Sequence, residues 1–199
     1  SMFSGASLIL GKLGSDVIAA HGIALNIAGL VFMVPLSIGL AAAVRVGNQI
    51  GASKFPNAQY SAFSAVKLGV IFGIVTCLTL LLFSKGIVTT IYTSDPNIIS
   101  IAIVLLIYAA VFQVADAITM CSMGSLRGYK DTLGPMFIMI LAYWIVGLPL
   151  GYSLAVTSFW SIQLGASGMW IGMTFGLFIA SVLMPWRLQH ISELQLKKE

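Results

Sequence analysis

Residues 132–186 read TLGPMFIMILAYWIVGLPLGYSLAVTSFWSIQLGASGMWIGMTFGLFIASVLMPW, a stretch without a single Asp, Glu, Lys or Arg. A soluble domain needs charged side chains for its hydrated surface, whereas this run is long enough for two membrane helices of about 20 residues and a turn. Of the 199 residues, 59% are hydrophobic and only 8% are charged, against about 25% charged in soluble proteins. We therefore predict an all-α, polytopic membrane protein, folded as a helical bundle.

Polar stretches rich in glycine or proline divide the chain into six apolar segments. We expect a partial span at 1–11 and five full spans at about 17–46, 61–84, 96–124, 134–157 and 166–188. The connecting stretches are RVGNQIGASKFPNAQ (45–59), RGYKDTLGP (127–135) and TSFWSIQLGASG (157–168). Residues 1–188 are thus predicted to form one transmembrane unit, and residues 189–199 a tail outside the membrane.

Lys and Arg are distributed unevenly between the two sides of this predicted bundle. One side collects eight of them, namely Arg45, Lys54, Lys67, Arg127, Lys130, Arg187, Lys197 and Lys198, and the other side collects Lys12 and Lys85. Since Lys and Arg are retained in cytoplasmic loops, the 45–60 loop, the 127–133 loop and the C-terminus are predicted to be cytoplasmic. The net charge of +4 then reflects topology and contact with anionic headgroups of the lipid bilayer. Nucleic acid is not an expected partner, because no basic surface with interleaved aromatic residues is present.

Asp116 lies within an apolar stretch, VFQVADAITM (111–120). A carboxylate at the centre of a membrane helix costs about 2.5–3.5 kcal/mol on insertion scales. Spacings of three and four residues place several side chains on its helix face, namely Ala109, Phe112, Gln113, Thr119, Met120 and Met123. Lipid cannot satisfy polar atoms at this depth, so we expect this face to point into the protein or a water-filled cavity.

Three roles for Asp116 follow from the residues alone. A low-dielectric surrounding favours a neutral carboxyl, which would allow proton exchange near neutral pH. An ionised carboxylate would instead attract an inorganic cation or a cationic solute, and both of these uses belong to transporters. The alternative is a non-transporting structural membrane subunit, in which Asp116 hydrogen-bonds a neighbouring helix as a packing residue. Asn or Ser would fill that last role at lower cost, which favours a use of the charge itself.

Enzyme chemistry is not expected. Cys77 and Cys121 lie inside predicted spans, and His21 and His190 are far apart in the sequence. The chain has neither metal-ligand spacing nor a hydrolase or metalloprotease motif. Catalytic residues are therefore predicted to be absent, and so is a cofactor.

Four stretches carry a resemblance to a known family: VFMVPLSIGLAAAVRVGNQIGA (31–52), QVADAI (113–118), GSLRGYKDT (124–132) and YWIVGLPLGY (143–152). In this order and spacing, the chain from about residue 3 to about residue 188 resembles the multidrug and toxic compound extrusion (MATE) transporters, most closely their NorM-like bacterial branch. The resemblance implies a twelve-helix transporter of two six-helix lobes in the bacterial inner membrane. Such a transporter is a secondary active antiporter, which exports cationic organic compounds or drugs in exchange for Na+ or H+. The chain would be the C-terminal lobe, helices 7–12, with the N-terminal six-helix lobe outside it.

The resemblance also implies roles for individual residues. Asp116 corresponds to the helix-10 aspartate that the family uses to bind the coupling cation, so it is the expected Na+ ligand. We expect Phe112 and Gln113 beside it in the cation site.

The expected substrate cavity is assigned to three other candidates, Thr119, Met120 and Asn26. Relatives often have a tyrosine where this chain has Phe112, and a glutamine where it has Gly22. The family's helix-7 glutamate would fall before Ser1.

Overall fold

The computed structural model describes residues 14–156 and 165–197, which are helical almost throughout. The helices in chain order are α2 (Ser15–Gly51), α3 (Phe55–Ile87), α4 (Pro96–Gly128), α5 (Leu133–Ile140), α6 (Leu148–Val156) and α7 (Gly165–Leu196). Two π-helical segments complete them: η2 (Val88–Tyr92) extends α3, and η3 (Leu141–Gly147) joins α5 to α6. The described residues contain no β-strand. The predicted all-α class is confirmed.

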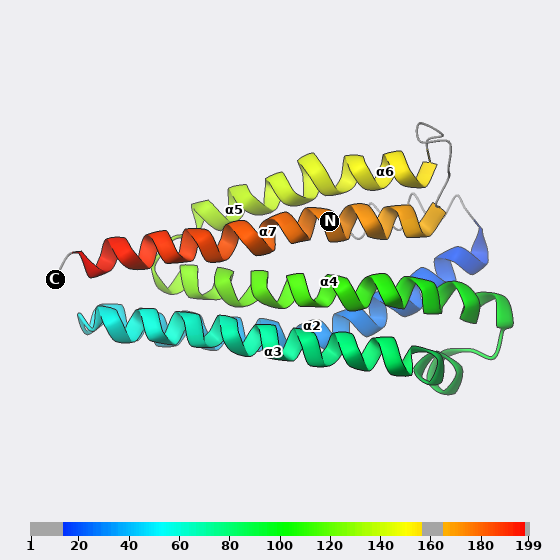
Figure 1. The fold of residues 1–199 in the computed structure, drawn as a ribbon, viewed down its shortest axis with the longest axis horizontal. Coiled ribbons are helices and arrows are strands. Elements are labelled where there is room, and N and C mark those ends of the chain that lie inside the picture. The colour runs from blue at the N-terminus through cyan, green and yellow to red at the C-terminus, as the bar shows by residue number, and fades with distance from the viewer. Residues whose placement is uncertain (1–13, 157–164, 198–199) are drawn as a thin grey trace.

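The helices lie side by side along the long axis of the molecule, and α4 occupies the middle of the bundle (Figure 1). Helix α4 packs against α2 and α3 on one side and against α7 on the other. Helix α7 in turn packs against α6 and η3, which form the outer layer beyond it. Helix α4, which contains the predicted span at 96–124, is therefore in position to contribute side chains to the centre of the bundle.

Five helical stretches are long and apolar enough to cross a membrane, judged by length and composition: Ser15–Gly51, Phe55–Tyr92, Pro96–Gly128, Leu133–Ala155 and Gly165–Leu196. They correspond in order to the five full spans predicted from the sequence, so the polytopic helical bundle is confirmed. The partial span expected at 1–11 lies outside the described residues.

The polar loop predicted at 45–59 is wrong in extent. Helix α2 continues to Gly51 and α3 begins at Phe55, so only residues 52–54 separate the two helices. Pro56 lies in the first turn of α3, where its missing N–H removes no helical hydrogen bond. Likewise α7 continues to Leu196, through most of the stretch predicted as a tail. Glycine, proline and charge mark the end of an apolar span more reliably than the end of a helix.

Glycines allow two pairs of helices to approach closely. A Cβ atom on Gly124 of α4 would overlap the backbone of Gly39 of α2, and one on Gly172 of α7 would overlap the backbone of Gly151 of α6. Small residues are favoured at helix contacts in membranes. Water provides no hydrophobic driving force between helices there, so close backbone approach and its van der Waals contacts hold the helices together. These contacts fix which face of each helix turns inward.

One ion pair lies at the end of the bundle where α4, α5 and α7 meet. The guanidinium of Arg187 donates from Nε to Asp131 Oδ2 at 2.6 Å and from Nη2 to Asp131 Oδ1 at 3.1 Å. The backbone N–H of Gly134 also donates to Oδ1 of Asp131, at 3.3 Å. This two-point contact joins the α4–α5 turn to α7.

Candidate functional site

Asp116 lies in the wall of a cavity of about 490 Å³ formed by α2, α4, α5 and η3. The lining residues are Leu25, Ala28, Gly29 and Phe32 of α2, Phe112, Asp116 and Met120 of α4, Met139 of α5 and Tyr143 of η3. Asp116 is the one ionisable carboxyl group among them. The cavity therefore combines a mainly apolar wall with a single carboxyl group.

The carboxylate of Asp116 forms neither a hydrogen bond nor an ion pair within the described parts of the chain. The residue is only 4% exposed. The ion pair found among the described residues joins Arg187 to Asp131, which do not line this cavity. An ionised carboxylate in apolar surroundings is unfavourable unless a proton or a cation accompanies it. The cavity is the space in which such a partner can approach.

Helix α4 places three of the predicted residues on this cavity. Phe112, Asp116 and Met120 are spaced by four residues, so they lie one above another along one helix face, and all three line the cavity. Each is largely buried. The predicted cation-site residue Phe112 and the predicted substrate-cavity residue Met120 therefore flank Asp116 on opposite sides.

The remaining predicted residues point elsewhere. Gln113 donates from Nε2 to the carbonyl oxygen of Ala28 at 2.9 Å, and the hydroxyl of Thr119 donates to the carbonyl oxygen of Ala115 on its own helix at 2.8 Å. Asn26 is exposed and accepts a hydrogen bond from the hydroxyl of Tyr92 at 2.7 Å. These three do not line the Asp116 cavity. Their proposed roles stay predictions.

Gln113 has one further feature. Its Oε1 atom is buried and has no hydrogen-bond partner within residues 14–156 and 165–197. The side chain is nearly inaccessible, so its amide group connects α4 to α2 while one acceptor stays unused. It stands next to the cavity wall without forming part of it.

An aromatic cluster supports the Phe112 side of the cavity. The ring of Phe112 meets the ring of Trp170 of α7 edge to face, with centroids 6.1 Å apart. Trp170 also donates from Nε1 to Nδ1 of His21 of α2 at 3.1 Å. Trp170 and His21 are both buried. The cluster thus connects α2, α4 and α7 directly beside the candidate site.

Sequence reasoning did not identify Phe32, Met139 and Tyr143 as lining residues. Each comes from a different helical segment than Asp116, and all three face the same cavity. Tyr143 stands in YWIVGLPLGY (143–152), a stretch that carries the family resemblance. Its place in this stretch was the one sequence feature that marked Tyr143, but a stretch of sequence does not show which way the side chain points.

Comparison with known proteins shows which family the chain resembles. The family model MatE matches residues 1–153 of the chain. The chain is 43% identical over 192 residues to the probable multidrug resistance protein NorM of Idiomarina loihiensis, covering 96% of this chain and 41% of that protein. It is 37% identical over 191 residues to the protein of the same name from Pasteurella multocida, with the same two coverages. The chain thus spans about two fifths of the length of these curated relatives.

Solved structures agree on the fold. The crystal structure of the eukaryotic MATE transporter AtDTX14 superposes with a TM-score of 0.84 at 18% identity, covering 99% of this chain and 44% of that chain. The Vibrio cholerae MATE transporter VcmN in the bent form gives a TM-score of 0.84 at 18% identity, with coverages of 98% and 43%. This helical arrangement therefore recurs as a part of larger MATE transporters.

The match to the family model, the NorM relatives and the shared fold agree with one another and with the resemblance seen in the sequence. These relatives are named for drug resistance and transport, and none is named as an enzyme. With its five apolar helices, the chain is a partial lobe of a multi-pass membrane protein, and it belongs to the MatE family.

Proposed function

We propose that the protein exports cationic organic compounds in exchange for Na+ or H+, and that this chain supplies one of its two lobes, the C-terminal one. The observation that carries the proposal is the Asp116 carboxylate, which borders an apolar cavity and has no cationic partner among the described residues. The names of the relatives, multidrug resistance proteins, support the substrate class. The membrane is proposed to be the bacterial inner membrane, with the C-terminus in the cytoplasm.

The chemistry of the cavity suits an exchange between two cations. A proton, a Na+ ion or the charged group of an organic cation would each relieve the cost of an ionised Asp116 in an apolar wall. One carboxylate carries a single negative charge, so two cations compete for it. Binding of one cation favours release of the other, and this competition is the basis of coupling.

The walls suit an organic substrate. A volume of about 490 Å³ lies within the range of about 300–1,000 Å³ typical of small-molecule sites. Met120 and Met139 line it, and flexible thioether side chains adapt to ligands of different shape. Orientation would come from Asp116, and affinity from apolar contact.

A purely structural role for Asp116 is less well supported. A packing residue in a membrane is expected to hydrogen-bond a neighbouring helix, and no such bond to Asp116 occurs among the described residues. Gln113, which does bond to α2 through Ala28, already supplies that kind of contact one turn away.

The test is Asp116→Asn in the full-length protein, reconstituted in vesicles with an imposed Na+ or H+ gradient. Asparagine keeps the size and the polar character of the side chain but cannot be charged. We expect ion-driven efflux of ethidium to fall about tenfold to a hundredfold, as loss of a charged contact worth about 1.5–3 kcal/mol implies. Insertion and thermal stability should stay close to wild type.

Asp16→Asn is the matched control. Asp16 lies in the first turn of α2, outside the cavity, so the same loss of charge there should leave efflux unchanged. Wild-type efflux by Asp116→Asn under both gradients would refute the coupling role.

A further inference from the structure

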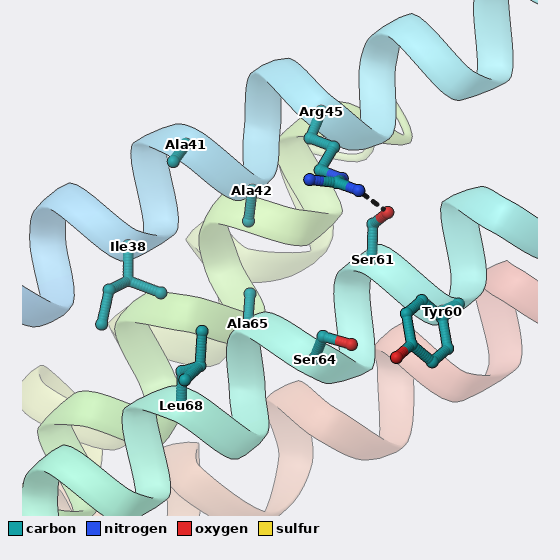
Figure 2. Close-up of a pocket in the computed structure, with 9 residues that line it drawn as sticks. All are labelled: Ile38, Ala41, Ala42, Arg45, Tyr60, Ser61, Ser64, Ala65 and Leu68. Carbon is teal, nitrogen blue, oxygen red and sulfur yellow. Dashed lines mark hydrogen bonds between the residues drawn. The ribbon is translucent and has the colours of Figure 1, made fainter.

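A second cavity, of about 420 Å³, lies between α2 and α3 (Figure 2). Its lining residues are Ile38, Ala41, Ala42 and Arg45 of α2, and Tyr60, Ser61, Ser64, Ala65 and Leu68 of α3. It shares no residue with the Asp116 cavity. The proposed transport function therefore does not account for it.

The groups that line this cavity change from polar to apolar along both helices. Arg45 lies near the end of α2, and Tyr60, Ser61 and Ser64 lie near the start of α3. Because the two helices are joined by residues 52–54, these groups belong to the same end of the groove. Ile38 and Leu68 lie further along each helix (Figure 2). The groove thus has a cationic, hydroxyl-rich end and an aliphatic end.

The polar end has unused hydrogen-bonding capacity. Arg45 donates from Nε to the hydroxyl of Ser61 at 3.2 Å, and its terminal nitrogens meet no carboxylate among the described residues. The hydroxyl of Ser64 is directed toward Tyr60 in Figure 2, and neither hydroxyl takes part in a hydrogen bond within the described residues. The guanidinium fork of Arg45 can therefore bind an anion, and the two hydroxyls offer further hydrogen bonds along the groove.

The outer surface around the groove is apolar. Leu40 and Val44 of α2 are 52% and 65% exposed, and Leu68 and Ile71 of α3 are 56% and 60% exposed. Only 17% of the most apolar part of the α3 span is buried within the described structure, compared with 56% for α7. A water-soluble anion gains nothing from such surroundings, whereas an acyl chain does.

We propose that this groove binds an acidic phospholipid, with the phosphate at Arg45 and the first part of an acyl chain against Ile38 and Leu68. The groove and the lipid share the same order of groups, from charged to apolar. Arginine binds phosphate oxygens through paired N–H groups, and basic pockets between membrane helices on the cytoplasmic side are typical sites for anionic headgroups. Arg45 belongs to the side of the bundle that the Lys and Arg distribution predicts to be cytoplasmic.

Native mass spectrometry of the full-length protein in mild detergent tests the proposal. The protein is incubated with phosphatidylglycerol or phosphatidylcholine of identical acyl chains. We expect wild type to retain phosphatidylglycerol about fivefold more strongly than phosphatidylcholine. This ratio corresponds to the contribution of one basic residue at an anionic lipid headgroup. Arg45→Gln should abolish this preference, and Arg45→Lys should keep part of it.

Arg127→Gln is the matched control, because Arg127 is an exposed arginine in the last turn of α4, outside this groove. It should retain the preference of wild type. The spectra report only on intact folded protein, so a misfolded fraction does not contribute to the result. Equal retention of the two lipids by wild type, or an unchanged preference in Arg45→Gln, would overturn the proposal.

Two other readings are distinguished by phosphate competition in the mass spectra and by the unfolding temperature of the same variants, measured in each lipid. If inorganic phosphate at millimolar concentration displaces phosphatidylglycerol from wild type, the site recognises a free anion and the lipid proposal is wrong. If Arg45→Gln lowers the unfolding temperature equally in both lipids without any lipid preference in wild type, Arg45 pairs with a protein carboxylate instead. Persistence of phosphatidylglycerol against phosphate supports the lipid.

Discussion

At the scale of single residues, Phe112 is one of the side chains that face the proposed cation position, and it contributes no oxygen atom to it. Its ring lines the cavity beside Asp116 and packs against Trp170. A phenyl ring brings no hydroxyl oxygen to the cavity, whereas a tyrosine here would add one. Hard cations such as Na+ prefer oxygen ligands, so the identity of this residue bears on ion preference.

Phe112→Tyr is therefore expected to strengthen Na+ coupling. An added hydroxyl one helical turn from Asp116 can contribute an oxygen ligand, and a gain of about 1 kcal/mol lowers the half-saturating Na+ concentration about fivefold. The measurement is ethidium efflux from vesicles as a function of the Na+ gradient.

Phe32→Tyr provides the comparison for this prediction. Phe32 lines the same cavity from α2, so it places a hydroxyl in the cavity without placing it on the Asp116 face of α4. An equal response of both variants would show that general polarity, rather than a ligand beside Asp116, changes the Na+ dependence.

The sequence predicted the α4 side of the site better than the opposite side, for a physical reason. Phe112, Asp116 and Met120 are related by helical spacing alone, which is local information. Met139 and Tyr143 belong to another span, whose rotation about its own axis depends on packing against its neighbours. Thr119 shares the helix with Asp116, yet its hydroxyl bonds back to its own backbone, as isolated hydroxyls in membrane helices commonly do.

At the scale of helices, glycine contacts set the rotations that local spacing does not encode. Gly39 of α2 and Gly124 of α4 meet backbone to backbone, and the same two helices supply most of the Asp116 cavity wall. The apolar spans could be predicted because burial in lipid requires about 20 apolar residues whatever the packing. The helix ends could not, because α2 and α7 continue as helices beyond their apolar parts.

Gly124→Ala should destabilise the bundle because its new methyl group would overlap the Gly39 backbone, which cannot rotate away as a side chain can. Overpacking of this kind costs about 1–3 kcal/mol. We expect a lower unfolding temperature in detergent and lower efflux, measured on the full-length protein. Gly86→Ala is the matched control, since a Cβ there meets nothing within 4 Å, and its stability should equal or slightly exceed that of wild type. Equal stability of the two variants would mean that the α2–α4 contact tolerates separation.

At the scale of the whole molecule, positive charge is concentrated at one end. Arg45 and Lys54 lie near the α2–α3 connection, Arg127 and Lys130 near the α4–α5 connection, and Arg187 near the end of α7. The ion pair between Asp131 and Arg187 joins two of these regions directly. The opposite end carries Lys85 among the described residues. This asymmetry predicts the orientation of the bundle without reference to any single site.

Reporter fusions test this orientation. Green fluorescent protein fluoresces when it is in the cytoplasm, and alkaline phosphatase is active only after export, so the two give opposite signals for one position. A fusion after Glu199 should be fluorescent and lack phosphatase activity, because α7 ends on the arginine-rich side. Insertion at Thr93, in the connection between η2 and α4, should give the reverse. An active phosphatase after Glu199 would invert the entire topology, and with it the proposal that Arg45 faces the acidic lipids of the cytoplasmic leaflet.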